Sequence, residues 1–398
     1  MSEVKSEKEN VMRLLQSGQM ESIELGLALA NSLQIDITEF KNDIEIAFGL
    51  ISESQNIPIS EKIWKIQESK EVDLSKRNLT DLPSQIKYFT DLTTLYIANN
   101  TLTRFSTEIG SLVKLDYLYA PNNQLKSLPF EIENLINLSY LNVTNNQLTF
   151  IPDQISKCVN LTELKLDNNQ LCSLPDKLSH LSKLEILSLG ENLFHLFPLE
   201  IAKITGLEVL NFQNNRLTTI PEELYNLTQL HTLSLDANQL ASISGKISKL
   251  TQLVRLSLDE NLLRFIPDEI GELKLLEVLF LDSNQLSSIP GQIGNLRYLA
   301  HLYISDNQLQ ELPIELFQCT ELYRFHINNN QLSFIQPEIE NFEKLQELQL
   351  AGNNLTSLPP EIAKLTRLNL LSLKNNPIPD SEKEKIKSWL PNCKIIFE

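Results

Sequence analysis

An asparagine recurs every 23 residues along most of this 398-residue chain, without a single insertion. The series is Asn100, Asn123, Asn146, Asn169, Asn192, Asn215, Asn238, Asn261, Asn284, Asn307, Asn330, Asn353 and Asn376. A fixed period of this size predicts one small structural unit stacked many times, each burying its apolar side against its neighbours. The repeat therefore overrides the expectation of roughly two or three ordinary domains that chain length alone would give.

Each unit follows the pattern LxxLxLxxNxLxxLPxxIxxLxx when Leu92 is numbered as offset 1. Apolar residues at offsets 4 and 6 alternate with polar ones at 3, 5 and 7, which predicts a short, half-buried strand. After offset 11 the pattern changes to Pro at 15, Ile at 18 and Leu at 21. Proline suits the first turn of a helix, so a helical or 3₁₀ segment is expected on the other side of the coil.

This pattern resembles that of the leucine-rich repeat family, and the match covers roughly Val72 to Asn376. It is similar to the 23-residue class of intracellular Ras-group and bacterial leucine-rich repeat proteins. The resemblance implies an α/β fold. We expect a right-handed solenoid with a curved parallel sheet on its concave face and short helices or 3₁₀ turns on its convex face.

The repeated asparagines are interpreted as scaffolding rather than as a binding stripe. Each turn after a strand leaves backbone groups pointing inward, and an amide side chain supplies both donors and acceptors. A ladder of amides can therefore satisfy successive turns of the solenoid.

The two ends of the chain do not repeat, as expected of segments that cap a solenoid. Residues 1–68 carry amphipathic helical patterns and are predicted to be either a helical cap or a docking or oligomerisation module. Arg77 takes the asparagine position of the first coil, so the helices are expected to pack there. The solenoid is predicted over residues 69–378, and residues 379–398 are predicted to form a C-terminal helix–strand cap.

The amino-acid composition limits the classes of partner that the chain can bind and indicates its cellular compartment. The net charge of −17 argues against nucleic acid and anionic membranes, which require Lys and Arg. No stretch approaches the roughly 20 apolar residues of a membrane span, and the N-terminus lacks the pattern of a secretory signal. The four cysteines show no disulfide or metal-ligand spacing, and Cys158 and Cys319 take positions of core leucines. The expectation is a soluble, reduced, cytoplasmic protein.

Residues at offsets 3, 5, 7 and 8 are expected to face the concave surface, where equivalent offsets of successive coils lie side by side. The first group found in this way is aromatic: Tyr96, Tyr117, Tyr119 and Tyr140. Tyrosine combines apolar area with a polar group and is enriched in binding hot spots. The group is predicted to bind a partner, the alternatives being contact with the N-terminal helices or a simple strand preference.

A second group combines aromatic, imidazole and guanidinium side chains. Its members are Phe280, His301, Tyr303, Arg324 and His326. These side chains are predicted to contact a peptide or an acidic side chain, the alternative being a solvated surface. No further ligand follows at matching offsets, so no metal site is predicted.

A third group is acidic, with aspartates at offset 7 of three consecutive coils. It comprises Asp236, Asp259, Glu260, Asp282 and Asp306. Stacked like charges destabilise a sheet, so a partner with a basic surface is a plausible reason for them. A solubilising negative face is the alternative.

No catalytic motif is found: the phosphate-binding loop, the zinc-protease motif, the nucleophile elbow and the kinase signature are all missing. The prediction is therefore a non-catalytic scaffold that binds a protein, with no cofactor. One alternative, suggested by the family resemblance alone, is regulation of a small GTPase or a protein phosphatase. A second is a structural homo-oligomer assembled through residues 1–68.

Overall fold

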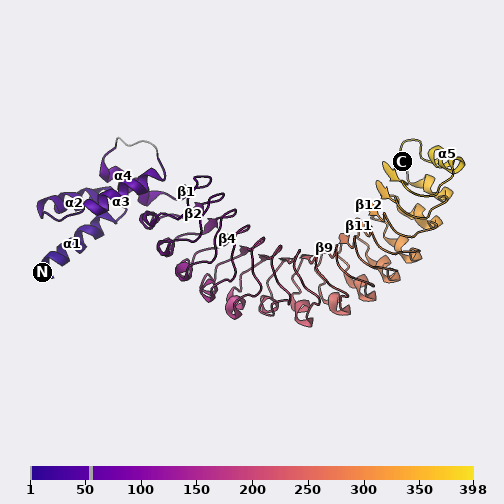
Figure 1. Cartoon of the computed structure of the whole chain (residues 1–398), viewed down its shortest axis with the longest axis horizontal. Coiled ribbons are helices and arrows are strands. Elements are labelled where there is room, and N and C mark those ends of the chain that lie inside the picture. Colours follow the sequence, from indigo (N-terminus) through magenta and orange to yellow (C-terminus); the bar gives the residue numbers. More distant parts are fainter. Residues whose placement is uncertain (1, 53–56) are drawn as a thin grey trace. The chain divides into compact units, whose positions relative to one another are not determined.

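The computed structural model describes residues 2–52 and 57–398 (Figure 1). Contacts divide the chain into two compact units, residues 1–184 and 185–398, and each unit is described by itself. The boundary falls inside the array of repeats. The division into residues 1–68, 69–378 and 379–398 therefore stays a prediction from the sequence.

The first unit begins with α-helices and continues as short parallel strands, each followed by a 3₁₀ helix. The α-helices are α1 (Ser2–Leu15), α2 (Met20–Ser32), α3 (Thr38–Gly49) and α4 (Ile59–Glu68). The strands are β1 (Glu71–Asp73), β2 (Thr94–Tyr96), β3 (Tyr117–Tyr119), β4 (Tyr140–Asn142) and β5 (Glu163–Lys165). The 3₁₀ helices are η1 (Ser84–Tyr88), η2 (Thr107–Ser111), η3 (Phe130–Asn134), η4 (Asp153–Lys157) and η5 (Asp176–His180).

The second unit repeats the same coil and ends in an α-helix and a strand. The strands are β6 (Ile186–Ser188), β7 (Val209–Asn211), β8 (Thr232–Ser234), β9 (Arg255–Ser257), β10 (Val278–Phe280), β11 (His301–Tyr303), β12 (Arg324–His326), β13 (Glu347–Gln349), β14 (Leu370–Ser372) and β15 (Lys394–Ile396). The 3₁₀ helices are η6 (Ile201–Lys203), η7 (Glu222–Asn226), η8 (Gly245–Lys249), η9 (Asp268–Glu272), η10 (Gly291–Asn295), η11 (Ile314–Gln318), η12 (Pro337–Asn341) and η13 (Pro360–Lys364). The α-helix is α5 (Asp380–Trp389).

Consecutive strands within each unit pair in parallel, with equivalent offsets as register partners. Leu95 is paired with Leu118 in the first unit, and Leu279 with Leu302 in the second. In β2 and β11 the strand residue at offset 4 is buried while its neighbours at offsets 3 and 5 are partly exposed, as the alternation predicts. We call the surface made by offsets 3 and 5 the strand face.

In most coils a proline introduces the 3₁₀ helix on the side opposite the strand, whereas Ser106 and Ser244 take this position in two coils. Pro129 precedes η3 with an extended backbone, and its carbonyl accepts a hydrogen bond of 3.2 Å from the amide of Ile132. Ile132 is buried. Proline thus stands at the N-cap of the 3₁₀ helix, one position before the first turn in which the sequence pattern placed it.

The asparagine ladder is structural, which confirms the prediction. The amide nitrogen of Asn238 donates to the carbonyls of Phe212 (3.0 Å), Leu235 (3.0 Å) and Asp236 (3.1 Å). Its amide oxygen accepts the backbone N–H of Leu217 at 2.9 Å. One side chain therefore satisfies backbone groups of two adjacent coils, and the same pattern recurs from Asn100 to Asn376.

The residue before each ladder asparagine adopts the left-handed conformation, which the sequence analysis did not foresee. Asn99, Glu260 and Asp306 have φ of 57°, 52° and 56°, and Gly352 has φ of 66° at the same offset. Asparagine, aspartate and glycine tolerate this conformation best. Offset 8 is thus chosen partly by backbone geometry.

Of the N-terminal helices, α3 packs against the first coil, where the degenerate Arg77 predicts contact. The carboxylate of Asp43 in α3 accepts hydrogen bonds of 2.8 Å from both Gln85 and Tyr88 of η1. The guanidinium of Arg77 donates to the carbonyl of Leu50 at 2.9 Å. These polar contacts hold α3 against the first coil.

Replacing Asn238 with Ala is expected to lower the free energy of unfolding by about 1–3 kcal/mol, because buried backbone groups lose their partners. Urea denaturation followed by circular dichroism measures this. The matched control is Gln239→Ala, whose side chain is exposed beside the ladder and should change stability little. Equal stability of the two variants would contradict the scaffolding role.

Candidate functional site

The four predicted tyrosines form one ring-to-ring group on the strand face of the first unit, here called the tyrosine cluster. Tyr117 stacks on Tyr140 with ring centroids 4.1 Å apart, and Tyr96 lies 5.7 Å from Tyr117 and 6.0 Å from Tyr119. All four side chains are partly exposed. The sequence therefore placed these residues correctly as neighbours on one surface.

Polar contacts fix the edge of the tyrosine cluster. The amide of Asn142 donates to the Tyr140 hydroxyl at 3.2 Å, and the Lys165 ammonium lies 5.6 Å from the Tyr140 ring. Lys165 is in turn paired with Glu163 at 2.6 Å. Burial, then the hydrogen bond with Tyr140, raises the pKa of the Tyr117 hydroxyl, which stays a neutral donor. In the described part of the chain, the ring contacts of the cluster are with one another and not with α1–α4.

The second predicted group also comes together, on β10, β11 and β12. Phe280 stacks on Tyr303 at 4.6 Å, and His326 meets the Tyr303 ring edge-on at 4.7 Å. His301 lies 6.4 Å from Tyr303. Arg324, at offset 3 of β12, is exposed. We call these five residues the aromatic–basic cluster.

Two residues of the surrounding strands were missed by the sequence analysis. The Arg255 guanidinium lies over the Phe280 ring at 4.4 Å and extends the aromatic stack by one coil. Glu347 lies 3.4 Å from the Arg324 Nε and 3.1 Å from the His326 Nε2. Both stand at offset 3, the same column as His301 and Arg324. The expectation that no further ligand follows at matching offsets was therefore wrong, because Glu347 is a carboxylate of that column in the coil after Arg324.

The imidazole of His301 is held neutral. Its partial burial, followed by the positive charge of Arg324, lowers its pKa below the ordinary value of 6.5. The described residues contain no group of three or more His, Cys, Asp or Glu side chains able to hold a metal ion. The chemistry of the cluster is therefore that of aromatic and cationic contacts.

The predicted acidic residues divide into two kinds. Asp236, Asp259 and Asp282 form a column, the aspartate column, whose carboxylates are only partly exposed. Glu260 and Asp306 stand beside it at the left-handed offset 8 and are exposed.

Each carboxylate of the aspartate column accepts a backbone hydrogen bond from the next coil. Asp236 accepts the amide of Asp259 at 3.0 Å, and Asp259 accepts the amide of Asp282 at 2.7 Å. Asp282 accepts the amide of Ser305, whose hydroxyl accepts the amide of Asn328 at 3.1 Å. Offset 7 thus carries a second ladder of acceptors, a structural reason for these residues that the sequence analysis missed.

The backbone bonds do not remove the electrostatic cost of the column. Burial, followed by the charge of Asp282, raises the pKa of Asp259 to about 7, and burial also raises that of Asp282. Within residues 2–52 and 57–398, no Lys or Arg forms an ion pair with the aspartate column. A basic group brought by a partner would relieve this repulsion.

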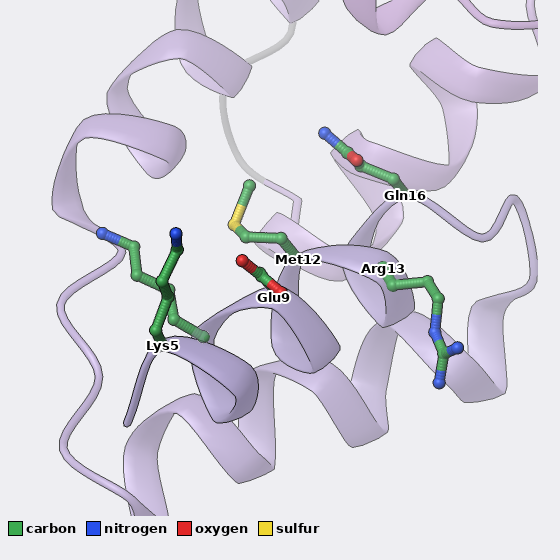
Figure 2. Close-up of a pocket in the computed structure, with 6 residues that line it drawn as sticks. Lys5, Glu9, Met12, Arg13 and Gln16 are labelled. Atoms are coloured by element: carbon green, nitrogen blue, oxygen red, sulfur yellow. The ribbon is translucent and has the colours of Figure 1, made fainter. Parts of the chain in front are cut away.

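A shallow pocket of about 610 Å³ lies on α1, away from the strand face. It is lined by Lys5, Lys8, Glu9, Met12, Arg13 and Gln16. Figure 2 shows Lys5, Glu9, Met12 and Arg13 projecting from α1, with Gln16 just beyond the last residue of this helix, Leu15. The lining thus combines side chains of both charges.

None of the helices in the described residues is both long and apolar enough to cross a membrane. The buried thiols of Cys158 and Cys319 replace core leucines, as predicted, and burial raises the pKa of both to about 12. They are therefore protonated and unreactive.

Comparison with protein families gives matches over most of the repeats. The family described as "Leucine rich repeat" matches residues 136–194, 249–317 and 320–378, and "Leucine Rich repeats (2 copies)" matches residues 205–249. A search of curated proteins gave no match.

Among the solved structures that resemble this chain are two bacterial proteins and a plant receptor. A leucine-rich repeat protein of Leptospira interrogans is 33% identical, with a TM-score of 0.75 over 87% of this chain and 100% of that one. An internalin of Listeria monocytogenes is 23% identical, with a TM-score of 0.72 over 83% of this chain and 94% of its own. The plant peptide hormone receptor RGFR1, solved in complex with RGF2, is 28% identical, with a TM-score of 0.58 over 80% of this chain and 61% of its own.

The aspartate column generates a pH-dependent prediction. The folded-state pKa of Asp259 lies above its ordinary value of 3.8, so this group's contribution to stability is lost as pH rises towards about 7. Asp259→Asn keeps the acceptor for Asp282 but removes the charge. Its stability relative to the wild type should therefore increase by about 1–2 kcal/mol from about pH 5 to about pH 8, after allowance for solvent screening.

Urea denaturation of both proteins at the two pH values measures this difference. The control is Glu311→Gln, which removes an exposed carboxylate elsewhere in the same unit and should follow the wild type. If the curves for wild type and Asp259→Asn stay parallel across the range, the column does not carry the inferred repulsion.

Proposed function

Because the chain belongs to the leucine-rich repeat family, we propose that it is a non-catalytic scaffold that binds a protein partner on its strand face. Proteins of this fold bind other proteins, as the plant receptor solved with RGF2 illustrates. The fold accounts for binding in general, and the side chains of the strand face must account for the choice of partner.

The tyrosine cluster is the observation that carries the proposal. Tyr96 and Tyr119 are packed against Tyr117 and yet partly exposed, so their rings are held in place before a partner arrives. Aromatic side chains that are already ordered lose little conformational entropy on binding. They also supply a large apolar area and a hydroxyl for hydrogen bonding.

The aspartate column supports a second contact region with a partner that has a basic surface. Its carboxylates are crowded, and a Lys or Arg of the partner would lower the electrostatic cost of leaving them charged. Glu260 and Asp306 widen the same negative surface. A cytoplasmic location, predicted from the cysteine usage, remains part of this proposal.

Two other functions stay predictions from the sequence. Regulation of a small GTPase or a protein phosphatase follows from the family resemblance, and no contact described above favours it. Self-association through residues 1–68 can be tested by light scattering, which measures the oligomeric state of the full chain. A monomer at micromolar concentration would exclude it.

Tyr96→Ala combined with Tyr119→Ala is expected to abolish capture of the partner, because both anchors of the strand face are lost. Thermal unfolding should change little, since both rings are partly exposed. Affinity purification of tagged wild type and variant from native cells, compared by quantitative mass spectrometry, measures capture.

Phe130→Ala is the matched control, because Phe130 is an exposed aromatic of the same unit that lies on η3 rather than on a strand. It should capture the same partner as the wild type. A partner that the tyrosine double variant still enriches normally would show that the tyrosine cluster is not the binding surface.

A further inference from the structure

A pocket of about 390 Å³ opens beside the aromatic–basic cluster, at the N-terminal ends of β11 and β12. Its walls include His301, Tyr323, Arg324, Glu321, Lys344 and Arg367. Lys344 and Arg367 stand one coil apart, in the turns that precede β13 and β14. We call it the cationic pocket.

The cations of this pocket are only partly neutralised. Lys344 is paired with Glu321 at 2.5 Å, and Arg324 lies 3.4 Å from Glu347. Arg367 has no ion pair or hydrogen-bonded side-chain partner among the residues that the structure describes. Two of the three cations in the lining are thus paired with a carboxylate, and Arg367 supplies the unpaired positive charge on a chain whose net charge is −17.

The wall between the cations is held in a fixed arrangement. The Tyr323 hydroxyl donates to the amide oxygen of Gln346 at 2.7 Å, and Asn369 donates to the same oxygen at 3.2 Å. The His301 ring meets Tyr323 edge-on at 5.9 Å, and the Arg324 guanidinium lies 5.7 Å from the Tyr323 ring. These contacts order the wall of the pocket, and among the described residues the guanidinium of Arg367 keeps its donors for an entering anion.

We propose that the cationic pocket binds a carboxylate side chain, from an Asp or Glu of an acidic segment in the protein partner. Guanidinium groups suit carboxylates because their donors match both oxygens, and Arg367 has donors to spare. The Phe280–Tyr303 stack lies next to the pocket and would contact the apolar residues of the same segment. This inference rests on the proposed function, because it describes a partner contact on the strand face of the second unit.

A nucleic acid would fit this surface poorly. The pocket lies at the start of the strands, whereas Asp259, Asp282 and Asp306 stand beyond the ends of β9, β10 and β11. A continuous polyanion that reached the pocket would also approach these carboxylates. A protein segment avoids the conflict, since acidic residues can face the pocket while basic ones face the aspartate column.

The test uses the full-length chain and three peptides of roughly twelve residues that share Tyr and Gly and differ only in Glu, Gln or Lys at the remaining positions. Binding is measured by fluorescence anisotropy at physiological ionic strength, where long-range repulsion by the net charge is screened. The Glu peptide should bind the wild type more tightly than the Gln peptide. Arg367→Glu should weaken Glu-peptide binding about tenfold or more.

Lys203→Glu is the control, because Lys203 is an exposed cation of the same unit that lies on η6, on the side of the coil opposite the strands. It makes the same charge change and should leave binding within about twofold. Arg367→Gln, which removes the charge without adding repulsion, should weaken the Glu peptide and leave the Gln peptide unchanged. Circular dichroism establishes that each variant is folded.

Two results would overturn the inference. One is an equal effect of Arg367→Glu and Lys203→Glu, which would indicate net charge alone. The other is tighter binding of a single-stranded oligonucleotide than of the Glu peptide. Neither result affects the tyrosine cluster, which belongs to the other unit, so capture of a partner through Tyr96 and Tyr119 is tested independently.

Discussion

The hydrogen bonds of the repeated asparagine hold one coil to the next. Each amide donates to carbonyls of its own turn and of the preceding coil, and accepts a backbone N–H of that preceding coil. Without it, several backbone groups in each turn would be buried with no partner, at a net cost of about 1–3 kcal/mol for each asparagine lost. Because the bonds join equivalent atoms every 23 residues, they also fix the register in which strands pair. The columns of side chains on the strand face depend on that register.

The same spacing gives the surface columns a double role. At offset 7 the carboxylates of Asp236 and Asp259 receive amides of the following coil, so they stabilise the array in the manner of the asparagines. Their mutual repulsion, visible in the raised pKa of Asp259, opposes this contribution. Serine and asparagine occupy the same column at Ser305 and Asn328 and accept equivalent amides without charge. Structure alone would therefore be served by neutral acceptors, and the charge of the three aspartates calls for a reason outside the coil.

The sequence predicted much of this architecture because the information lies in a strict period. The buried positions Leu95 and Leu279, the ladder asparagines and the grouping of the four tyrosines all follow from offset and register. Features that depend on side-chain conformation did not follow. The position of Arg255 over Phe280 and the wall that Gln346 and Asn369 build around Tyr323 arise from rotamers and from neighbours 23 residues away. The pattern of residue types specifies which side chains are neighbours on the strand face. It does not specify the rotamers that bring neighbouring side chains into contact.

The residues that stabilise the coils and the residues available for binding lie largely at different offsets. This separation explains how a strict repeat can carry a particular binding surface. Offset 9 is asparagine in every coil from Asn100 to Asn376, and offset 4 is an apolar residue throughout, since each coil must satisfy the same backbone and fill the same core. Offsets 3 and 5 contribute little to either task, so they are free to be tyrosine in one coil and arginine in another. Conversely, a column that stays uniform over only three coils, such as the aspartates at offset 7, cannot be explained by a requirement shared by all coils. A column that is uniform over a few coils, while the same offset varies in the other coils, is thus the pattern expected of a surface that binds a partner.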